Sequence, residues 1–484
     1  MTASGTSVPY QLVGSVPAAA PAAARRIPWP PLSAFRQSPS AAEFHGRLRE
    51  MEHSLAEEAG LQPSIPTPPL ATVASAPPVV GDTRTFSVLK DGSLIGDKAS
   101  DYVQVSATVK FVGSRTAVYL DDAAPAPTYS TSDIQQLGSM FNDHLYGIDT
   151  TAFGRESDID GDGLVLILLT DRVTKLLPCT GGQVIIGFFF AGDLLPNHAG
   201  SNGGEIFYGL VPDASCGVSV QYARGKLPPV MIHEFQHMIS YNQHVLLQAR
   251  GSKPEATWLN EGLSSFAEEL GGRLVPDALC SNNSCLTQFT IIDLDNAASY
   301  LSDPASGYLI GPVRTVLPPS EYGSGWLFVR WLMDHYATTP DLGTDLTRKL
   351  ENTTLTGEDN VVHATGVPFG SLVINWQLAN YLDNLPGFTP ADPLLQYASW
   401  DFRATYASLH AQDPAAFPAT YPLEPPVAPD GAYQEIGTLL GGSGRHLLVE
   451  QSAGAPDVSL RLTETDSTAL PASAVPRIAV VRIR

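Results

Sequence analysis

The sequence predicts an α+β protein in which a mixed sheet precedes a lobe of helices. Residues 81–127 alternate apolar and polar side chains between short turns, which is typical of antiparallel strands. Two apolar runs, 163–170 and 182–195, indicate buried strands. From residue 228 onward, apolar residues recur mainly with a helical period. These three observations together predict the fold class.

The first eighty residues predict little packed structure of their own. Residues 1–37 are rich in Ala and Pro and are interpreted as a tail. Residues 38–61 predict a helix, because a capping-box pattern precedes an apolar stripe. Residues 62–80 are rich in Pro and predict an extended linker. This arrangement permits the segment 1–80 to be a removable pro-segment.

Further helices are expected where an apolar stripe recurs at helical spacing. They cover residues 130–146, 228–248, 258–271, 321–337 and 369–384. The last third of the chain mixes Pro-rich loops with short strands and closes with SAVPRIAVVRIR. We therefore expect a flanking β-rich domain built from the two ends of the chain.

Composition narrows the classes of partner. The 28 basic and 49 acidic residues give a formal net charge of −21. Such an acidic surface repels phosphate backbones, so no nucleic-acid partner is expected. No apolar run is long enough to predict a membrane span. The first residues lack the basic start and apolar core of a signal peptide, so a signal peptide is not expected in this sequence.

The four cysteines favour an oxidising compartment. Cys280 and Cys285 flank the turn-rich tetrapeptide SNNS, so a small disulfide loop is plausible there. Cys179 and Cys216 would then form the second pair. Four cysteines permit three pairings, and the sequence leaves the choice open. A zinc knuckle is the alternative, although no CxxC occurs.

The stretch HEFQH predicts a metal site. His233 and His237 are four residues apart, so both imidazoles leave one face of a helix and can meet one ion. Glu234 lies between them and projects beside that ion. A helical histidine pair can equally be buried in a core, so a third ligand decides. A structural zinc site needs four protein ligands, whereas a catalytic one needs three and a water.

His244 is interpreted as lying outside the metal site. On a continuous helix it lies eleven residues after His233, roughly 16 Å along the axis. A glycine at position 240 could bend the chain back, but this residue is Ser240.

Glu261 is the better third ligand. It follows His237 by 24 residues, enough for the first helix to end and a second helix to return. A buried carboxylate needs a compensating charge, which a dication facing two imidazoles provides. Glu268, two turns further on, either accepts an imidazole N–H or is an ordinary solvated charge.

HEFQHMI followed by WLNEGLS resembles the gluzincin metallopeptidases. WLNEG also resembles the third-ligand segment of the aminopeptidase N family, whose G-x-M-E-N signature is absent here. Upstream, TRTFSVL, VQVSATVKFVG and AFGRESDIDGDGLVLILLT resemble the hyicolysin-type neutral zinc metallopeptidases of bacteria. The resemblance covers about residues 81–400. It implies a thermolysin-like zincin catalytic domain, with a mixed sheet and a helical lobe, in a secreted or cell-surface protein.

The resulting division of the chain has four parts. They are a tail, short helix and linker at 1–80, a small antiparallel β domain at 81–127, the zincin catalytic domain at 128–400, and a Pro-rich and β region at 401–484.

The resemblance implies a Zn²⁺-dependent metalloendopeptidase that acts on a protein or peptide substrate. His233, His237 and Glu261 would hold the zinc, whose bound water becomes acidic enough to lose a proton near neutral pH. Glu234 would take that proton and pass it to the leaving amine.

Tyr322 is the expected donor to the oxyanion of the tetrahedral intermediate. The aminopeptidase family places a tyrosine of this role similarly, ahead of a small residue and an aliphatic helix. The alternative is a packing residue with a solvated hydroxyl. His335 is a weaker candidate for the same role.

Asp158, Asp160 and Asp162 alternate and are followed by glycine, which resembles the first half of a calcium loop. An EF-hand requires glutamate at the twelfth position, which is Leu169 here. These residues therefore either hold Ca²⁺ in another geometry or form a tight turn before a strand, and the turn is preferred.

Two other functions fit the same residues. One is an aminopeptidase-like gluzincin with an unrecognised anchor for the substrate amine. The other is a surface binding protein whose zinc site is structural or vestigial. Cleavage of blocked peptides separates the first from an endopeptidase, and the effect of Glu234→Gln separates the second from any peptidase.

Overall fold

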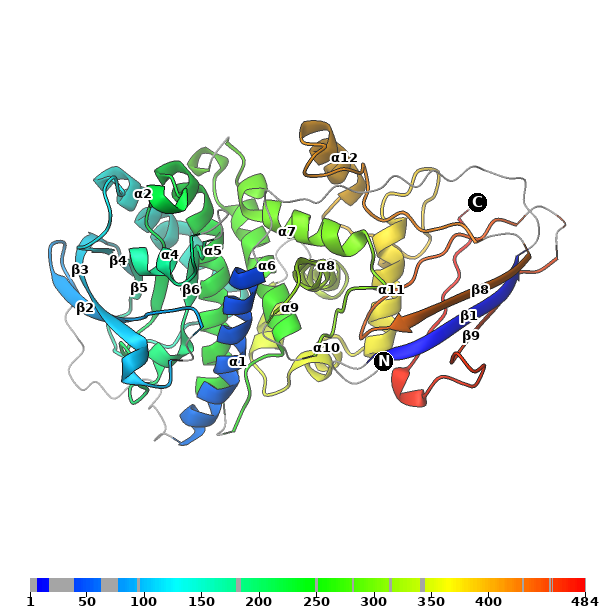
Figure 1. Ribbon diagram of the computed structural model, residues 1–484, viewed down its shortest axis with the longest axis horizontal. Helices are drawn as coiled ribbons and strands as arrows, with labels where there is room; N and C mark the ends of the chain where they lie inside the picture. Colours follow the sequence, from blue (N-terminus) through cyan, green and yellow to red (C-terminus); the bar gives the residue numbers. More distant parts are fainter. Residues whose placement is uncertain are drawn as a thin grey trace.

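The computed structural model places two sheets at opposite ends of its long axis, with most of the helices between them (Figure 1). It describes residues 7–16, 39–61, 77–93, 96–179, 184–248, 251–280, 283–312, 316–339, 344–428, 431–451, 454 and 456–483. Most of the expected Ala/Pro-rich tail and linker therefore lies outside the described residues. The described secondary structure is mixed, which confirms the α+β class.

The larger sheet has six strands in the order β2-β3-β4-β5-β7-β6. The first three strands are antiparallel, β4, β5 and β7 are parallel, and β6 runs antiparallel to β7 at the edge. The strands are β2 Thr83–Leu89, β3 Tyr102–Val112, β4 Thr116–Asp121, β5 Val165–Leu169, β6 Gly187–Phe189 and β7 Ile206–Gly209. The strands expected at 81–127 thus belong to the same sheet as later strands, and the division into domains stays a prediction.

The strand at 182–195 is much shorter than the sequence predicted. Within its described part only Gly187–Phe189 pairs as a strand, and a 3₁₀ turn follows at Ala191–Leu194. Asp193 lies in this turn, where its buried carboxylate accepts hydrogen bonds from Asn202 and Tyr208. A buried carboxylate with side-chain and backbone donors anchors the turn and ends the strand.

The helices between the sheets carry the residues singled out from the sequence. Their bounds are α5 Val220–Tyr241, α6 Thr257–Leu274, α7 Cys285–Leu301, α8 Pro319–Tyr336, α9 Thr344–Glu351, α10 Gly357–Thr365 and α11 Phe369–Leu382. Other helices are α1 Pro39–Leu61, α2 Thr131–Met140, α3 Tyr146–Ala152, α4 Asp171–Lys175 and α12 Phe402–Gln412. α5 packs against β6, β7 and α6.

α5 begins eight residues earlier than the expected start at residue 228. The hydroxyl of Ser219 accepts a hydrogen bond from the backbone N–H of Tyr222, which caps the helix there. Pro228 and Pro229 therefore lie inside the helix instead of at its start. The α-helical part ends at Tyr241, and a π-helical turn follows directly over Asn242–Leu246.

α6 and α8 approach closely because two glycines face each other. A Cβ added at Gly262 would lie 2.8 Å from the carbonyl oxygen of Gly325. Gly262 follows Glu261, and Gly325 lies one turn after Tyr322. Any larger side chain at the crossing would push apart the two helices that carry these residues.

The smaller sheet joins the two ends of the chain in the order β8-β1-β9. Its strands are β1 Val8–Val16, β8 Gly431–Leu439 and β9 Ser459–Thr463. β1 is the central strand and is antiparallel to both neighbours. A β-rich flank from the two chain ends was expected, but its central strand at residues 8–16 corrects the interpretation of residues 1–37 as a tail, because β8 and β9 pair with this segment on both sides.

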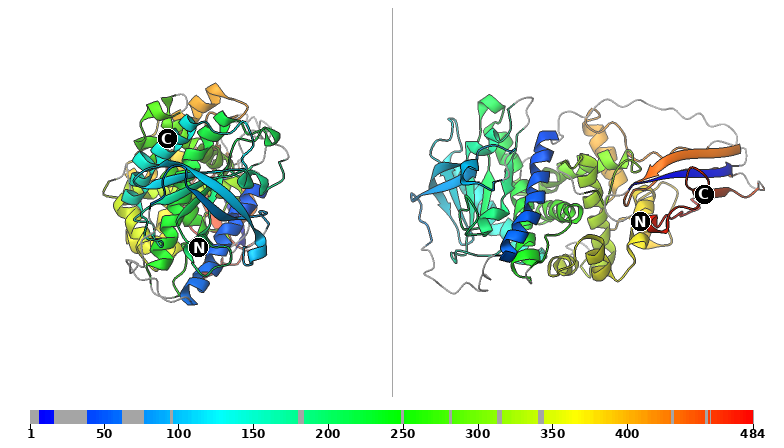
Figure 2. Two further views of the ribbon diagram at one scale, coloured as in Figure 1. Left: turned by 90° about the vertical axis from the view of Figure 1, so that its left-hand side faces the viewer. Right: turned by 60° about the horizontal axis from the view of Figure 1, so that its bottom comes forward.

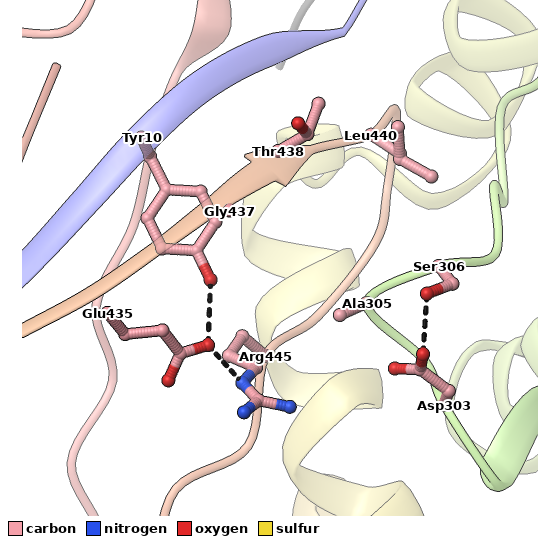
Figure 3. A pocket seen from close by; sticks show the side chains of 9 residues that line it. All are labelled: Tyr10, Asp303, Ala305, Ser306, Glu435, Gly437, Thr438, Leu440 and Arg445. Carbon is pink, nitrogen blue, oxygen red and sulfur yellow. Dashed lines mark hydrogen bonds and ion pairs between the residues drawn. The ribbon is translucent and has the colours of Figure 1, made fainter. Parts of the chain in front are cut away.

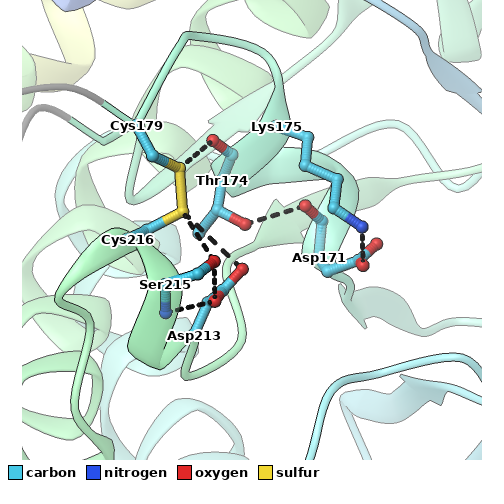
Figure 4. The surroundings of a disulfide bond; sticks show 7 residues. All are labelled: Asp171, Thr174, Lys175, Cys179, Asp213, Ser215 and Cys216. Atoms are coloured by element: carbon cyan, nitrogen blue, oxygen red, sulfur yellow. Dashed lines mark hydrogen bonds and ion pairs between the residues drawn. A yellow bond between two sulfur atoms is a disulfide. The ribbon is translucent and has the colours of Figure 1, made fainter.

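Two disulfides connect the four cysteines. Cys179 pairs with Cys216, beside the turn that Asp213 caps (Figure 4). Cys280 pairs with Cys285. Of the three pairings that the sequence left open, this is the one that the SNNS loop favoured. Among the described helices, none combines the length and the apolar character needed to cross a membrane.

Candidate metal centre

α5 brings His233 and His237 together, one turn apart on the same face. Their rings are 4.9 Å apart between centroids, and their Nε2 atoms lie 3.2 Å from each other. The backbone spacing of the helix produces this convergence directly.

Glu261 at the start of α6 completes a group of three ligand atoms. Its Oε2 lies 3.3 Å from Nε2 of His233 and 3.7 Å from Nε2 of His237. Ligands about 2.1 Å from a tetrahedral zinc ion lie roughly 3.4 Å from one another. The group His233, His237 and Glu261 could therefore hold one metal ion.

The outer nitrogen of each histidine faces a hydrogen-bond acceptor. Nδ1 of His233 lies 2.7 Å from Oε1 of Glu268, and Nδ1 of His237 lies 3.1 Å from Oδ1 of Asn260. A ring that donates from Nδ1 presents a lone pair at Nε2. Two lone pairs and a carboxylate oxygen then point at one spot, which is the electronic requirement of a cation site. Oε1 of Glu268 thus lies within hydrogen-bond distance of an imidazole nitrogen, which is one of the two roles that the sequence left open for it. The contact of Asn260 with His237 was not predicted.

The pKa shifts of His233 and Glu261 favour their charged forms, whereas that of His237 favours the neutral ring. Burial opposes the charge on His233, but hydrogen bonds to Glu261 and Glu268 outweigh burial and raise its pKa well above the usual range. Burial lowers the pKa of His237 to about 3. Burial also opposes ionisation of Glu261, yet the two histidines outweigh it and hold its pKa well below the usual range.

Glu234 lies beside this group without belonging to it. Its side chain is 1% exposed, and its Oε2 accepts a hydrogen bond of 3.1 Å from the backbone N–H of Phe189 in β6. Burial raises the pKa of Glu234, while Arg49 acts in the opposite direction. A carboxylate with a raised pKa is suited to accept and return a proton.

The two candidate oxyanion donors lie in different places. Tyr322 is buried at the start of α8, and within the described residues its hydroxyl has no hydrogen-bond partner. Burial raises the pKa of Tyr322 well above the usual range, and the nearby charge of Glu261 adds to this. His335 lies thirteen residues later, about 20 Å along the helix, where its Nε2 is 2.9 Å from the carbonyl oxygen of Gln396. Of the two, only Tyr322 is near the metal group.

His244 belongs to a different cluster. It lies in the π-helical turn after α5, with Nε2 3.5 Å from Oε2 of Glu351 and 3.8 Å from Oε2 of Glu255. It is not part of the group that could hold a metal ion with His233.

A second group within the described residues consists of Asp158, Asp160 and Glu205. The predicted tight turn is present, because Oδ1 of Asp158 accepts the N–H of Gly163 and Oδ1 of Asp162 accepts that of Leu164. Asp162 is not in the second group, and Glu205 takes its place.

Glu205 was missed because its partners are distant in the sequence. It directly precedes β7, which is parallel and adjacent to β5, and the Asp158 loop precedes β5. Residues that directly precede two adjacent parallel strands lie close together, at the amino ends of those strands. The short run IFYG was not recognised as a strand, so this signal could not be used.

A hollow of about 490 Å³ lies away from the metal group, between the smaller sheet and the loop after α7 (Figure 3). Its charged side chains pair with one another. Oε1 of Glu435 accepts from the Tyr10 hydroxyl at 3.2 Å and lies 2.5 Å from Nε of Arg445. The remaining charged side chain of the described lining, Asp303, accepts a hydrogen bond from the hydroxyl of Ser306.

Comparison with known proteins gives a distant similarity. The neutral metalloprotease ShpI of Staphylococcus hyicus is 26% identical over 195 residues, which is 40% of this chain. The similarity spans 40% of the relative, so the chain matches about two fifths of that protein's length. No protein-family model matches the chain. This similarity suggests a hydrolase of the metalloprotease kind.

Proposed function

We propose that this chain is a zinc-dependent metalloendopeptidase of the gluzincin type, closest to the hyicolysin family and with a thermolysin-like catalytic fold. The observation that carries the proposal is the convergence of two imidazole nitrogens and a carboxylate oxygen beside Glu234. The distant similarity to a neutral metalloprotease supports it independently.

The donor set fits zinc. Two imidazoles and one carboxylate are three protein ligands of the kinds that catalytic zinc sites use, which leaves a position for water. When bound, zinc would supply Lewis acidity that lowers the pKa of a water molecule and polarises a carbonyl. Glu268 and Asn260 would fix the orientation of the two imidazoles through their outer nitrogens.

Glu234 is the general base and then the general acid in this proposal. Its carboxylate accepts a proton from the attacking water and delivers it to the amine that leaves. The backbone N–H of Phe189 holds one of its oxygens in place.

Tyr322 is proposed to stabilise the oxyanion. Its buried hydroxyl without a hydrogen-bond partner among the described residues is a donor ready for a developing negative charge.

Replacement of Glu234 by Gln tests the proposal. The amide keeps the shape but cannot take a proton, so we expect kcat/KM on casein and on a fluorogenic peptide to fall by about 10²–10⁴-fold. Zinc content, measured in the same samples, should stay unchanged. Unchanged cleavage by Glu234→Gln would refute this mechanism.

Blocked peptides test the endopeptidase part. A peptide with an acetylated amino end and an amidated carboxyl end offers no free terminus to an exopeptidase. We expect it to be cut internally, with fragments identified by mass spectrometry. Cleavage restricted to peptides with a free amino end would favour the aminopeptidase-like alternative.

We also propose that Asp158, Asp160 and Glu205 bind calcium. All three residues offer carboxylate oxygens as ligand atoms, which are the ligands that calcium prefers. Glu205 is 1% exposed, and its Oε2 has no hydrogen-bond partner among the described residues, so a cation would compensate a buried charge.

Thermal unfolding tests the calcium site. Calcium at a hundredfold excess over its Kd should stabilise the chain by about 2.7 kcal/mol. Glu205→Gln should abolish this shift, and Asp162→Asn should retain it because Asp162 is outside the group. A shift that survives in Glu205→Gln would place the ion elsewhere.

The two disulfides support an oxidising compartment, so we propose a secreted or cell-surface bacterial protein. Its proposed partner is a protein or peptide substrate.

A further inference from the structure

α1 lies across the junction between the half that carries the larger sheet and the helical half (Figures 1 and 2). It is the dark blue helix in front of α5 and α6 in Figure 1. One face of α1 is buried against the rest of the molecule. Its buried apolar residues are Ala41, Ala42, Phe44, Leu48, Met51, Leu55 and Ala56.

Arg49 projects from this buried face towards the candidate metal centre. Its Nη2 lies 3.9 Å from Oε2 of Glu234, and its Nε lies 4.0 Å from Oε1 of Glu261. Glu52, on the same helix, is 3.2 Å from Nη2. The side chain of Arg49 is 2% exposed, and its nitrogens make no hydrogen bond within the described residues. Charge alone therefore holds the guanidinium between the two carboxylates.

Two further residues of α1 contact groups beside the candidate metal centre: His45 lies against Glu234, and Phe44 packs against β6. Nδ1 of His45 is 3.5 Å from Oε1 of Glu234, so the proposed catalytic base faces α1 with both oxygens. The ring of Phe44 packs edge-on against Phe188 of β6, with centroids 5.3 Å apart. β6 is an edge strand of the larger sheet. Its last residue, Phe189, donates its backbone N–H to Glu234. An edge strand is where an extended peptide can pair with a sheet.

α1 is also fixed near both of its ends. Nη2 of Arg47 donates to the carbonyl oxygen of Gly92 at 2.5 Å. Near the other end, Oε2 of Glu58 is 2.8 Å from Nδ1 of His198. These contacts hold α1 in its place over the centre.

With α1 in place most of the catalytic groups are closed off from solvent, and only the side chain of His233, 14% exposed, is partly open. Glu234 and His237 are each 1% exposed, and Glu261 is 4% exposed. A peptidase must admit an extended chain to its metal and its base. We propose that α1 is an intramolecular inhibitor, held by Arg49 against Glu234 and Glu261, which must leave before a substrate can bind. This inference rests on the proposed peptidase function and names the regulation of the same site.

Reversal of the charge at position 49 tests the proposal in the full-length, zinc-loaded chain. Arg49→Glu places a carboxylate against Glu234 and Glu261 and should expel α1. Because apparent activity scales with the fraction of open molecules, we expect kcat/KM on a blocked fluorogenic peptide to rise about tenfold or more. Glu57→Lys is the matched control, since it reverses a charge on the exposed face of α1. It should leave kcat/KM unchanged.

Two results would overturn the inhibitor role. A large fall in kcat/KM for Arg49→Glu would mean that Arg49 assists catalysis. An unchanged kcat/KM would mean that α1 does not limit access.

Amide hydrogen exchange in the wild-type chain provides a second test. It does not depend on the folding of a variant or on substrate turnover. A blocked peptide hydroxamate occupies the substrate side of a zinc site. At saturation it should increase amide exchange in residues 41–60 relative to the chain without the hydroxamate. Equal or slower exchange in this helix with the hydroxamate bound would contradict displacement of α1.

The two proposals fail in distinguishable ways. If the wild type already cleaves the peptide as fast as Arg49→Glu, α1 is not an inhibitor and the peptidase function stands. If neither cleaves, although both bind zinc, the peptidase function fails and the inhibitor role fails with it. Adding Glu234→Gln to Arg49→Glu should remove any activity that the charge reversal releases.

Discussion

Two buried histidine–carboxylate clusters lie two turns apart along the same helical segment, and only one of them resembles a metal site. In the first, His233, His237 and Glu261 direct their acceptor atoms at one point. In the second, His244 lies near Glu255 and Glu351 at similar distances. Residue type and burial are therefore nearly the same in the two clusters. The difference lies in the donors around Glu255 and in the convergence of three ligand atoms, which among the described residues the first cluster has and the second lacks.

In the second cluster both oxygens of Glu255 and one oxygen of Glu351 have donors, whereas Oε2 of Glu351 and the ring nitrogens of His244 have no hydrogen-bond partner among the described residues. Oε1 of Glu255 accepts from the backbone N–H groups of Ala256 and Gly357, and its Oε2 accepts from Asn360. Oε1 of Glu351 accepts from Gln236. In the first cluster the outer nitrogens are engaged and the inner atoms face one another; the Ser264 hydroxyl lies 3.2 Å from Nε2 of His237 but donates to Gln236. A cluster of acceptors becomes a candidate metal site when three ligand atoms converge on one point and the protein directs no hydrogen at it.

The largest expected effect contrasts one carboxylate from each cluster. Glu261→Gln removes the charged ligand oxygen of the group, so we expect zinc affinity to fall about a thousandfold or more. Glu351→Gln should leave zinc affinity unchanged, because burial already raises the pKa of Glu351 well above the usual range and favours its neutral form. Competition with a fluorescent chelator measures both. Equal losses in the two variants would erase the distinction between the clusters.

His244 should affect the pH dependence of the free energy of unfolding and should not affect zinc binding. Burial lowers its pKa from 6.5 to about 4, so the unfolded chain binds a proton more readily than the folded chain between these values. The folded state therefore loses stability as pH falls through this range, by about 3 kcal/mol from this group. His244→Gln should lack that loss. Urea unfolding at pH 4, 5, 6 and 7 would show the gap between variant and wild type change with pH, whereas a constant gap would contradict this.

The smallest effect concerns the outer partner of His233. Glu268→Gln keeps a hydrogen-bond acceptor but removes the charge that favours the Nδ1 proton, so zinc affinity should fall by about 10–100-fold. Glu255→Gln is the matched control from the second cluster and should leave zinc affinity unchanged. If Glu268→Gln binds zinc like the wild type, its contact with His233 does not tune the site.

The part of the candidate site that lies within two consecutive helices could be predicted from the sequence. The spacing of His233 and His237 on one helix and the return of Glu261 on the next are local patterns, and the structure brings these three residues together. The outer contact of Glu268 follows from the same helix. The α+β class was also predictable from periodicity, whereas the strand at residues 8–16 was not, because this segment was interpreted as part of a tail.

What could not be predicted depends on contacts between distant segments. Nothing near Arg49 in the sequence indicates that it faces Glu234 and Glu261, about two hundred residues later. Glu205 meets the Asp158 loop only because β5 and β7 are adjacent. The early start of α5 shows a different limit, since the cap at Ser219 outweighed the helix-starting preference of the two prolines.

Crystallography of the zinc-loaded wild-type chain, with anomalous data collected at the zinc edge, tests the central claim most directly. The account predicts one peak within about 2.0–2.2 Å of His233 Nε2, His237 Nε2 and a carboxylate oxygen of Glu261. A peak that lies on His244, Glu255 and Glu351, or a zinc ion whose third protein ligand is a residue other than Glu261, would contradict it.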